Sequence, residues 1–260
     1  LNLMAADDYK KWLDIDFSEQ PQYVFGDTGP QAESFCSTYE DSIPVLSDAD
    51  VRAAVQAEES TGGADKLVSR IYNQKQEGSC VANACCQSHE IVQGLQFGKD
   101  AVVHLAAISL YKRIGRSPGS GASVSDGLQE LSSRGALPLD NEENRSRFLD
   151  KVMPNTGFYE KFPADWENTA KNFTIVEHHV IRSLEGMKTA LVLGHPVVVG
   201  RQGHSICYCR LMIKNGRFVA KYANSWGNWG DNGFGYDSES QMRMSAGWAF
   251  AVRQVRRELP

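Results

Sequence analysis

Three residues that are far apart in the sequence have the side chains needed for nucleophilic catalysis. Cys80 follows a Gly-Ser turn and begins a run of helical periodicity, so its thiol is expected at a helix N-terminus, where unpaired amides and the helix dipole stabilise a thiolate. His204 and Asn224 come later in the chain, each at the end of a predicted strand. A thiolate is a nucleophile, and a cysteine that is accompanied by a histidine and an asparagine elsewhere in the chain is a candidate catalytic residue. The order Cys, His, Asn therefore indicates nucleophilic catalysis by Cys80.

The elements that must position these residues divide the chain into a helical half and a strand half. Apolar residues recur at helical spacing over residues 80–95, 102–111 and 123–135. The second half has β-branched runs that predict strands at 174–181, 196–200, 205–212, 217–223 and 248–255, with one helix at 184–193. Helices followed by strands predict an α+β architecture with two lobes and a cleft between them.

The motifs around these residues resemble those of the papain-like cysteine peptidases, in particular the compact bacterial and viral members. The resemblance runs from about Val68 to the C-terminus and rests on the segment 73–84, the Gly203-His204-Ser205 turn and the glycine-rich motif that begins at Asn224. It implies a papain-like two-lobed fold, with a helical N-terminal lobe and an antiparallel β-sheet or barrel in the C-terminal lobe. It also implies hydrolysis of a polypeptide substrate through a thioester intermediate.

The resemblance implies a role for each matching catalytic residue. Cys80 corresponds to the nucleophile, His204 to the general base and acid, and Asn224 to the residue that orients the imidazole. Gln74 corresponds to the oxyanion-hole glutamine, which acts beside the Cys80 main-chain N–H. An imidazolium next to the thiolate lowers the thiol pKa, so Cys80 is expected to be the one hyper-reactive cysteine, with alkylation that persists below pH 6.

Three further residues correspond to substrate-binding positions, namely Gly121, Ser205 and Trp226. The glycine backbone is expected to pair with an extended substrate, and the indole to cover the hydrogen bond between Asn224 and His204. Glu77 stands where plant and lysosomal members have a disulfide cysteine, and Val81 stands where they have an aromatic residue. Substrate preference is therefore not carried over.

Composition narrows the possible partners and cofactors. The chain has 260 residues, a formal net charge of −5 and six cysteines whose spacing matches neither a zinc site nor a disulfide framework. Acyl transfer through a thiolate needs no metal or organic cofactor, so none is expected. The charge disfavours nucleic acid, and no apolar run is long enough for membrane insertion. No signal peptide is visible, which together with the cysteine pattern favours a cytoplasmic or virion-associated protein.

The first fifty residues differ from the rest of the chain. They contain eleven acidic residues, two basic residues and seven aromatic residues, so we expect an extension that docks on a surface. The predicted division is an acidic aromatic extension at 1–50 and a catalytic domain at 51–260, with a helical lobe at about 68–137 and a β lobe at about 170–258. The extension docks either near the cleft, where it restrains the enzyme, or on another subunit.

Two other functions remain open from the sequence. The same thioester serves an acyl transferase or a deamidase, and only product analysis separates these from a peptidase. A structural or binding subunit of a larger assembly, such as a virion, can also retain the fold. The joint presence of Gln74, Cys80, His204 and Asn224 argues against such an inactive site.

Overall fold

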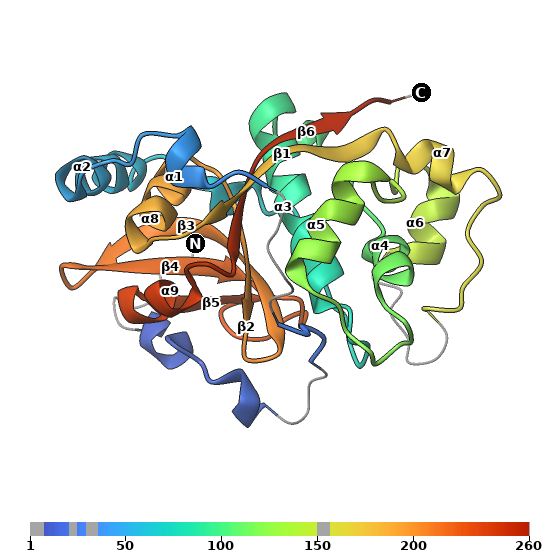
Figure 1. Ribbon diagram of the computed structural model, residues 1–260, viewed down its shortest axis with the longest axis horizontal. Helices are drawn as coiled ribbons and strands as arrows, with labels where there is room; N and C mark the ends of the chain where they lie inside the picture. Colours follow the sequence, from blue (N-terminus) through green and yellow to red (C-terminus); the bar gives the residue numbers. More distant parts are fainter. Residues whose placement is uncertain (1–7, 21–24, 30–35, 150–156, 260) are drawn as a thin grey trace.

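A computed structural model describes residues 8–20, 25–29, 36–149 and 157–259 of the chain. Figure 1 shows helices gathered on one side and the strands, with their own covering helices, on the other. The helical side consists of α3 (Cys80–Phe97), α4 (Ala107–Ile114), α5 (Val124–Ser133), α6 (Glu142–Phe148) and α7 (Trp166–Ala170), with short 3₁₀ turns η3 (Ala64–Leu67) and η4 (Lys99–Ala101). The two-lobed α+β architecture expected from the sequence is confirmed.

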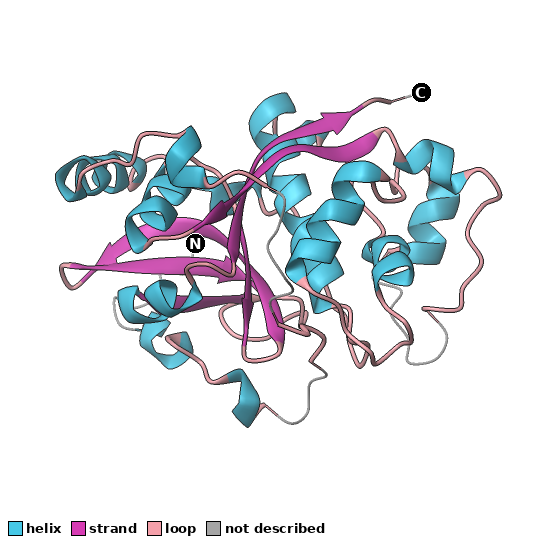
Figure 2. Cartoon of the chain, in the orientation of Figure 1, coloured by secondary structure: helices cyan, strands magenta, loops and turns pink. Residues whose placement is uncertain are grey.

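The other lobe is built on one open, six-stranded antiparallel sheet (Figure 2). The strand order is β1-β6-β2-β3-β4-β5, so the sheet does not close into a barrel. The strands are β1 (Phe173–Ile181), β2 (Val197–Arg201), β3 (His204–Lys214), β4 (Arg217–Ala223), β5 (Phe234–Ser238) and β6 (Ala249–Arg257). Of the two forms expected for this lobe, the structure has the open sheet.

Side chains alternate along β3 between two hydrophobic cores, because successive residues of a strand point to opposite faces. Cys207 and Cys209 belong to the core that contains α3, whereas Ile206 and Tyr208 belong to the core on the opposite face. In the described part of this lobe, the α-helices are α1 (Tyr39–Ser42), α2 (Asp48–Glu58), α8 (Leu184–Val192) and α9 (Glu239–Ser245), and the 3₁₀ helices η1 (Asp8–Trp12) and η2 (Phe17–Glu19) precede them. The central strand is thus buried on both sides and holds His204 at its beginning.

Capping residues mark the ends of some of the helices. Ser123 caps α5 by accepting a hydrogen bond from the Asp126 main-chain N–H, and Gly135 follows the helix with a φ of 70°, which glycine adopts without steric cost. The run from Val102 to Tyr111 is helical only from Ala107 onward, because Leu105 instead forms a β-bridge with Pro138. The helix at Cys80 and that at Leu184 match their predicted ranges closely.

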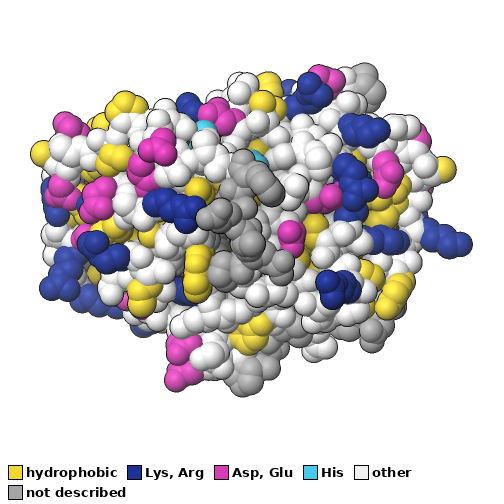
Figure 3. All heavy atoms as spheres, viewed as in Figure 1, with side chains coloured by type: hydrophobic (Ala, Val, Ile, Leu, Met, Phe, Trp, Pro, Cys, Tyr) yellow, Lys and Arg dark blue, Asp and Glu magenta, His cyan; other side chains and the backbone are white. Residues whose placement is uncertain are grey.

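Residues 36–58 pack on the β lobe. Tyr39 is fully buried, and Val51 and Val55 of α2 lie in the same core as the sheet residues Val197 and Val199. On the face shown in Figure 3, Lys and Arg side chains lie on both halves of the molecule, with Asp and Glu side chains among them. Part of the predicted extension therefore belongs to the packed lobe.

Candidate active site

The first residue of α3 brings the Cys80 thiol to the junction of the two lobes. Cys80 is fully buried, and Ser79 occupies the N-cap position of the helix. The main-chain N–H of Ser205, at the start of β3, lies next to the thiol and favours its thiolate form. The thiol thus lies at the helix N-terminus, as the sequence predicts, and next to the strand that begins with His204.

His204 and Asn224 are joined by a hydrogen bond of 2.8 Å between the imidazole Nε2 and the amide Oδ1. Both residues are buried. The indole of Trp226 stacks on the imidazole, with ring centroids 4.4 Å apart and an interplanar angle of 25°. Since an aromatic cover excludes water from the bond, it favours one fixed orientation of the imidazole ring.

The Gln74 side chain is fixed at both ends of its amide. Its Nε2 donates to the main-chain carbonyl of Glu77 at 2.8 Å, and its Oε1 accepts from the Ser225 hydroxyl at 2.5 Å. The Gln74 main-chain N–H also donates to the Ser225 carbonyl at 2.8 Å. Hydrogen bonds of Gln74 therefore connect the loop before Cys80 to the loop after Asn224.

The N-terminal segment, of which the structure describes residues 8–20 and 25–29, lies on this site. It first extends the free edge of the sheet, where Leu13 forms a parallel bridge with Tyr236 of β5. Phe17 is fully buried. Its ring packs edge to face against the His204 imidazole, with ring centroids 4.8 Å apart. The Arg201 guanidinium also lies over the Phe17 ring, 4.5 Å from its centroid. Figure 1 shows the described segment in dark blue, beneath the sheet lobe and then at the boundary between the lobes.

Further along, the segment pairs with both lobes through its backbone. The Asp27 N–H donates to the Gly203 carbonyl at 2.8 Å, on the β lobe. On the helical lobe, the Ala122 N–H donates to the Gly26 carbonyl at 2.6 Å, and Thr28 N–H donates to the Ala122 carbonyl at 2.9 Å. The backbone beside Gly121, which the resemblance assigns to substrate pairing, thus pairs with the chain's own N-terminal segment.

Burial by this segment changes the ionisation of the thiol. The pKa of Cys80 is raised to about 12, first by desolvation and then by the nearby Asp27 carboxylate. Main-chain N–H groups, including that of Gly26, oppose the rise without reversing it. Burial therefore favours the neutral thiol over the thiolate in this structure.

Burial also lowers the pKa of the His204 imidazole to about 3, although its hydrogen bond to Asn224 favours the charged form. Among the described residues, the imidazole Nδ1 has no hydrogen-bond partner, and this includes the Cys80 thiol. Burial thus disfavours, in the covered site, the thiolate–imidazolium pair that the sequence predicts. The alkylation of Cys80 below pH 6 stays a prediction for the open site. The helix N-terminus and the imidazole are in place, but water is excluded, and without it the charged pair is disfavoured.

The residues predicted to bind substrate lie around Cys80 and His204. Trp226 covers the bond between His204 and Asn224, as the resemblance implies. The Ser205 side chain points to the opposite face of β3 from His204 and lines a small internal cavity, while its main-chain N–H faces the thiol. The roles of Phe17 and Gly26 were not assigned from the sequence, although the cluster of aromatic residues around them had indicated that the segment docks.

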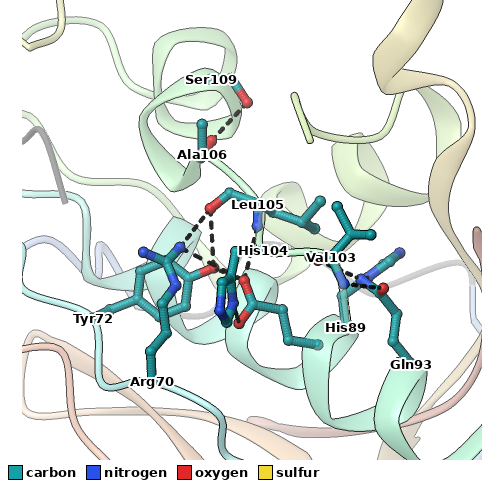
Figure 4. A network of polar contacts seen from close by, with 10 residues as sticks. Arg70, Tyr72, His89, Gln93, Val103, His104, Leu105, Ala106 and Ser109 are labelled. Atoms are coloured by element: carbon teal, nitrogen blue, oxygen red, sulfur yellow. Dashed lines mark hydrogen bonds and ion pairs between the residues drawn. The ribbon is translucent and has the colours of Figure 1, made fainter. Parts of the chain in front are cut away.

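A buried network of polar side chains joins α3 to the segments on either side of it in the sequence (Figure 4). Glu90 is fully buried and accepts hydrogen bonds from the Leu105 N–H at 2.8 Å and from the Tyr72 hydroxyl, and it pairs with His104 at 3.0 Å. Burial alone raises the pKa of a carboxyl group, but the Arg70 charge and the His104 contact bring the pKa of Glu90 below its ordinary value. Tyr72 is thereby fixed next to the loop that carries Gln74.

Several further observations concern cofactors and membranes. In the part of the chain that the structure describes, no group of three or more His, Cys, Asp or Glu side chains is arranged to hold a metal ion. All six cysteines have free thiols. None of the helices over the described ranges combines the length and hydrophobicity that crossing a bilayer requires.

Comparison with solved structures identifies the fold. Xylellain, a cysteine protease from Xylella fastidiosa, superposes with a TM-score of 0.66 over 90% of this chain and 97% of its own, at 18% sequence identity. The fold is papain-like. The recombinant stem bromelain precursor gives a TM-score of 0.63 at 16% identity, covering 95% of this chain and 81% of its own. A digestive procathepsin L 3 from the larval midgut of Tenebrio molitor gives 0.61 at 16% identity, covering 92% and 79%.

Comparison by sequence gives no such match. No family model matches the chain, and no curated protein matches it significantly. The papain-like fold is therefore recognised from its three-dimensional arrangement.

Proposed function

We propose that this chain is a papain-like cysteine peptidase, held latent by its own N-terminal segment. The observation that carries the peptidase proposal is the 2.8 Å bond between His204 and Asn224 beneath Trp226, next to the strand residue whose N–H meets the Cys80 thiol. The papain-like fold of proteins described as cysteine proteases supports the same chemistry.

In the proposed reaction, the open site has a Cys80 thiolate and a His204 imidazolium. The thiolate attacks the carbonyl carbon of a peptide bond, and the oxyanion is held by the Gln74 amide and the Cys80 main-chain N–H. The imidazolium then gives its proton to the leaving amine, which leaves a thioester. His204 next takes a proton from water, whose oxygen attacks the thioester, and the carboxylic acid product and the thiolate are released.

Latency follows from the position of Gly26. A β-carbon on Gly26 would overlap the backbone carbonyl of Gly78, so the segment approaches the Cys80 loop more closely than any other residue type permits. Phe17 meanwhile fills the space beside the imidazole. A tethered segment acts at high effective concentration, so modest contacts suffice to exclude substrate.

A substitution in the full-length chain tests both parts of the proposal. Gly26→Ala is expected to displace the segment and to raise peptide cleavage by at least about 10-fold over the unmodified chain. Cleavage is measured with a mixture of fluorogenic peptides, and Cys80 labelling with an iodoacetamide-type probe and peptide mapping. Adding Cys80→Ala to Gly26→Ala is expected to abolish both signals.

The matched control is Gly29→Asn in the same segment. A β-carbon at Gly29 meets nothing within 4 Å, and asparagine tolerates the left-handed φ of 82° better than most residues. This variant is expected to stay latent. Labelling of Cys80 in Gly26→Ala without peptide cleavage would exclude a peptidase, and product analysis with added amines would then identify an acyl transferase. Full activity of the unmodified chain would exclude latency.

A further inference from the structure

A small cavity adjoins the pair formed by His204 and Asn224, between α3 and the ends of β3 and β4. Its volume is about 10 Å³, close to the roughly 10–15 Å³ that one water molecule needs. The residues that line it are Tyr72, Asn83, Ala84, Gln87, Ser205, Ala223, Asn224 and Ser225. The cavity is therefore polar on several sides and has the size of a single water site.

Polar atoms of three lining side chains have no hydrogen-bond partner among the described residues. Neither Oε1 nor Nε2 of Gln87 is paired, although this side chain is only 3% exposed. The Ser205 hydroxyl and the Asn224 Nδ2 are also unpaired, in residues that are 1% and 2% exposed. Buried polar groups are almost always hydrogen-bonded, to protein or to an internal water.

We infer that this cavity binds one internal water molecule that joins Gln87 to Asn224, and that Gln87 is thereby a positioning residue for the His204 imidazole. The effect on turnover rests on the proposed function, whereas the water site does not. Gln87 does not belong to the motifs on which the resemblance rests, and it touches neither the thiol nor the imidazole in any contact described above.

The physical reason lies in the two-fold ambiguity of the Asn224 amide. Its Oδ1 accepts from His204 Nε2 at 2.8 Å and from the Ser225 N–H at 2.7 Å. A half-turn of the amide would instead place its NH₂ group against these two donors. A water held by Gln87 and the Ser205 hydroxyl gives Nδ2 an acceptor, so that every polar group of Asn224 is satisfied in the productive orientation.

A structure determination tests the water site directly. The full-length protein is crystallised with and without Gln87→Met, which removes both polar atoms at nearly constant volume. We expect one water within hydrogen-bond distance of Gln87, Ser205 and Asn224 in the unmodified chain, and its loss in Gln87→Met. A cavity without water, or a water that does not contact Asn224, overturns the inference.

Kinetics test the positioning role, with Gly26→Ala as the parent chain. Gln87→Met is expected to lower kcat roughly 10-fold with KM unchanged, as expected when one hydrogen bond to a charged group is weakened. It is also expected to move the alkaline limb of kcat/KM to lower pH, because a poorly held Asn224 stabilises the imidazolium less. Gln87→Glu, which keeps a polar group of the same size, should restore most of kcat.

The control is Gln96→Met on the same helix, whose side chain bonds to Val255 far from the cavity. It should leave kcat and the pH profile of the parent unchanged. A fall in thermal stability of Gln87→Met with an unchanged pH profile and kcat would show a merely structural role and overturn the positioning inference. If the Gly26→Ala parent itself cleaves no peptide, the proposed function fails, and the crystal structures still decide the water site.

Discussion

At the scale of single residues, the side chain of Gln74, the candidate oxyanion donor, is held in a fixed orientation. Both atoms of the Gln74 amide are bonded, to Glu77 and to Ser225, and the residue is fully buried. A donor that is fixed before the reaction pays no reorganisation cost when the oxyanion forms. Gln74 is therefore expected to act on the transition state and not on the ionisation of Cys80.

We predict that Gln74→Ala, added to Gly26→Ala, lowers kcat by about 10² to 10³, the usual loss for one oxyanion donor. KM and the labelling of Cys80 should change little, because the thiolate and imidazolium do not depend on this amide. Steady-state kinetics and probe labelling on the same preparations check this. Retention of full turnover would move the oxyanion donor to another residue.

The sequence located the reacting groups but not their protonation. Cys80, His204 and Asn224 stand in local motifs with turn and strand signals, and the structure brings His204 and Asn224 into direct contact. The raised pKa of Cys80 reflects instead its burial and the charge of Asp27, a residue more than fifty positions earlier in the chain. Local motifs carry no information on such tertiary burial, so the sequence predicts the charged pair, whereas burial in this structure disfavours it.

At the scale of elements, prediction succeeded where capping or turn residues mark the ends. The strand at Arg217–Ala223 matches its predicted range, and the helix after Ser123 begins where its side chain caps the backbone. β5 (Phe234–Ser238) was missed because it has five residues, one of them glycine, and is defined mainly by its pairing with β4. The predicted boundary at residue 50 also falls among residues that pack as one unit.

The packing of residues 36–58 on the β lobe leads to a prediction about where the chain can be shortened. Tyr39 is fully buried and its hydroxyl bonds to His195 Nδ1 at 2.9 Å, while Glu40 Oε1 accepts from the Ser183 N–H at 2.8 Å at the beginning of α8. A chain that starts at Val51 loses both contacts, and loss of a large buried aromatic side chain costs about 3–5 kcal/mol.

We therefore expect a chain that starts at Cys36 to unfold in one transition and to label at Cys80, and one that starts at Val51 to unfold at a clearly lower temperature. Thermal unfolding followed by circular dichroism compares them. Equal midpoints for both chains would show that residues 36–50 add nothing to the core of the β lobe.

At the scale of the whole molecule, the proposed latency depends on a segment whose backbone pairs with both lobes, at Gly203 and at Ala122. Asp27 is mostly buried between the lobes, and its pKa is raised to about 6 by desolvation, while the Gly29 N–H opposes the rise. When the segment leaves, Asp27 returns to its ordinary pKa of 3.8. The docked state then binds more protons than the open state between these values, so docking is strongest near pH 4 and weakens as pH rises through 6.

Cys80 and His204 contribute little to the pH dependence of docking between pH 4 and pH 6. In the docked state Cys80 keeps its proton and His204 is neutral; in the proposed open state the proton has moved from the sulfur to the imidazole. The number of bound protons on the pair is equal in both states, so it contributes no slope there. Asp27 is therefore expected to set the pH dependence of latency, with up to about 100-fold weaker docking at pH 7 than near pH 4.

The measurement is the rate of Cys80 labelling in the full-length chain, divided by the rate in Gly26→Ala at the same pH. This ratio removes the intrinsic pH dependence of the open thiolate. We expect it to rise between pH 4 and pH 7 for the unmodified chain and to stay flat for Asp27→Asn, which places a neutral amide of equal size between the lobes. A ratio that falls with rising pH would contradict the assignment. Release of the segment would then follow its protonation and not the ionisation of the Asp27 carboxyl group, which is packed against Gly200.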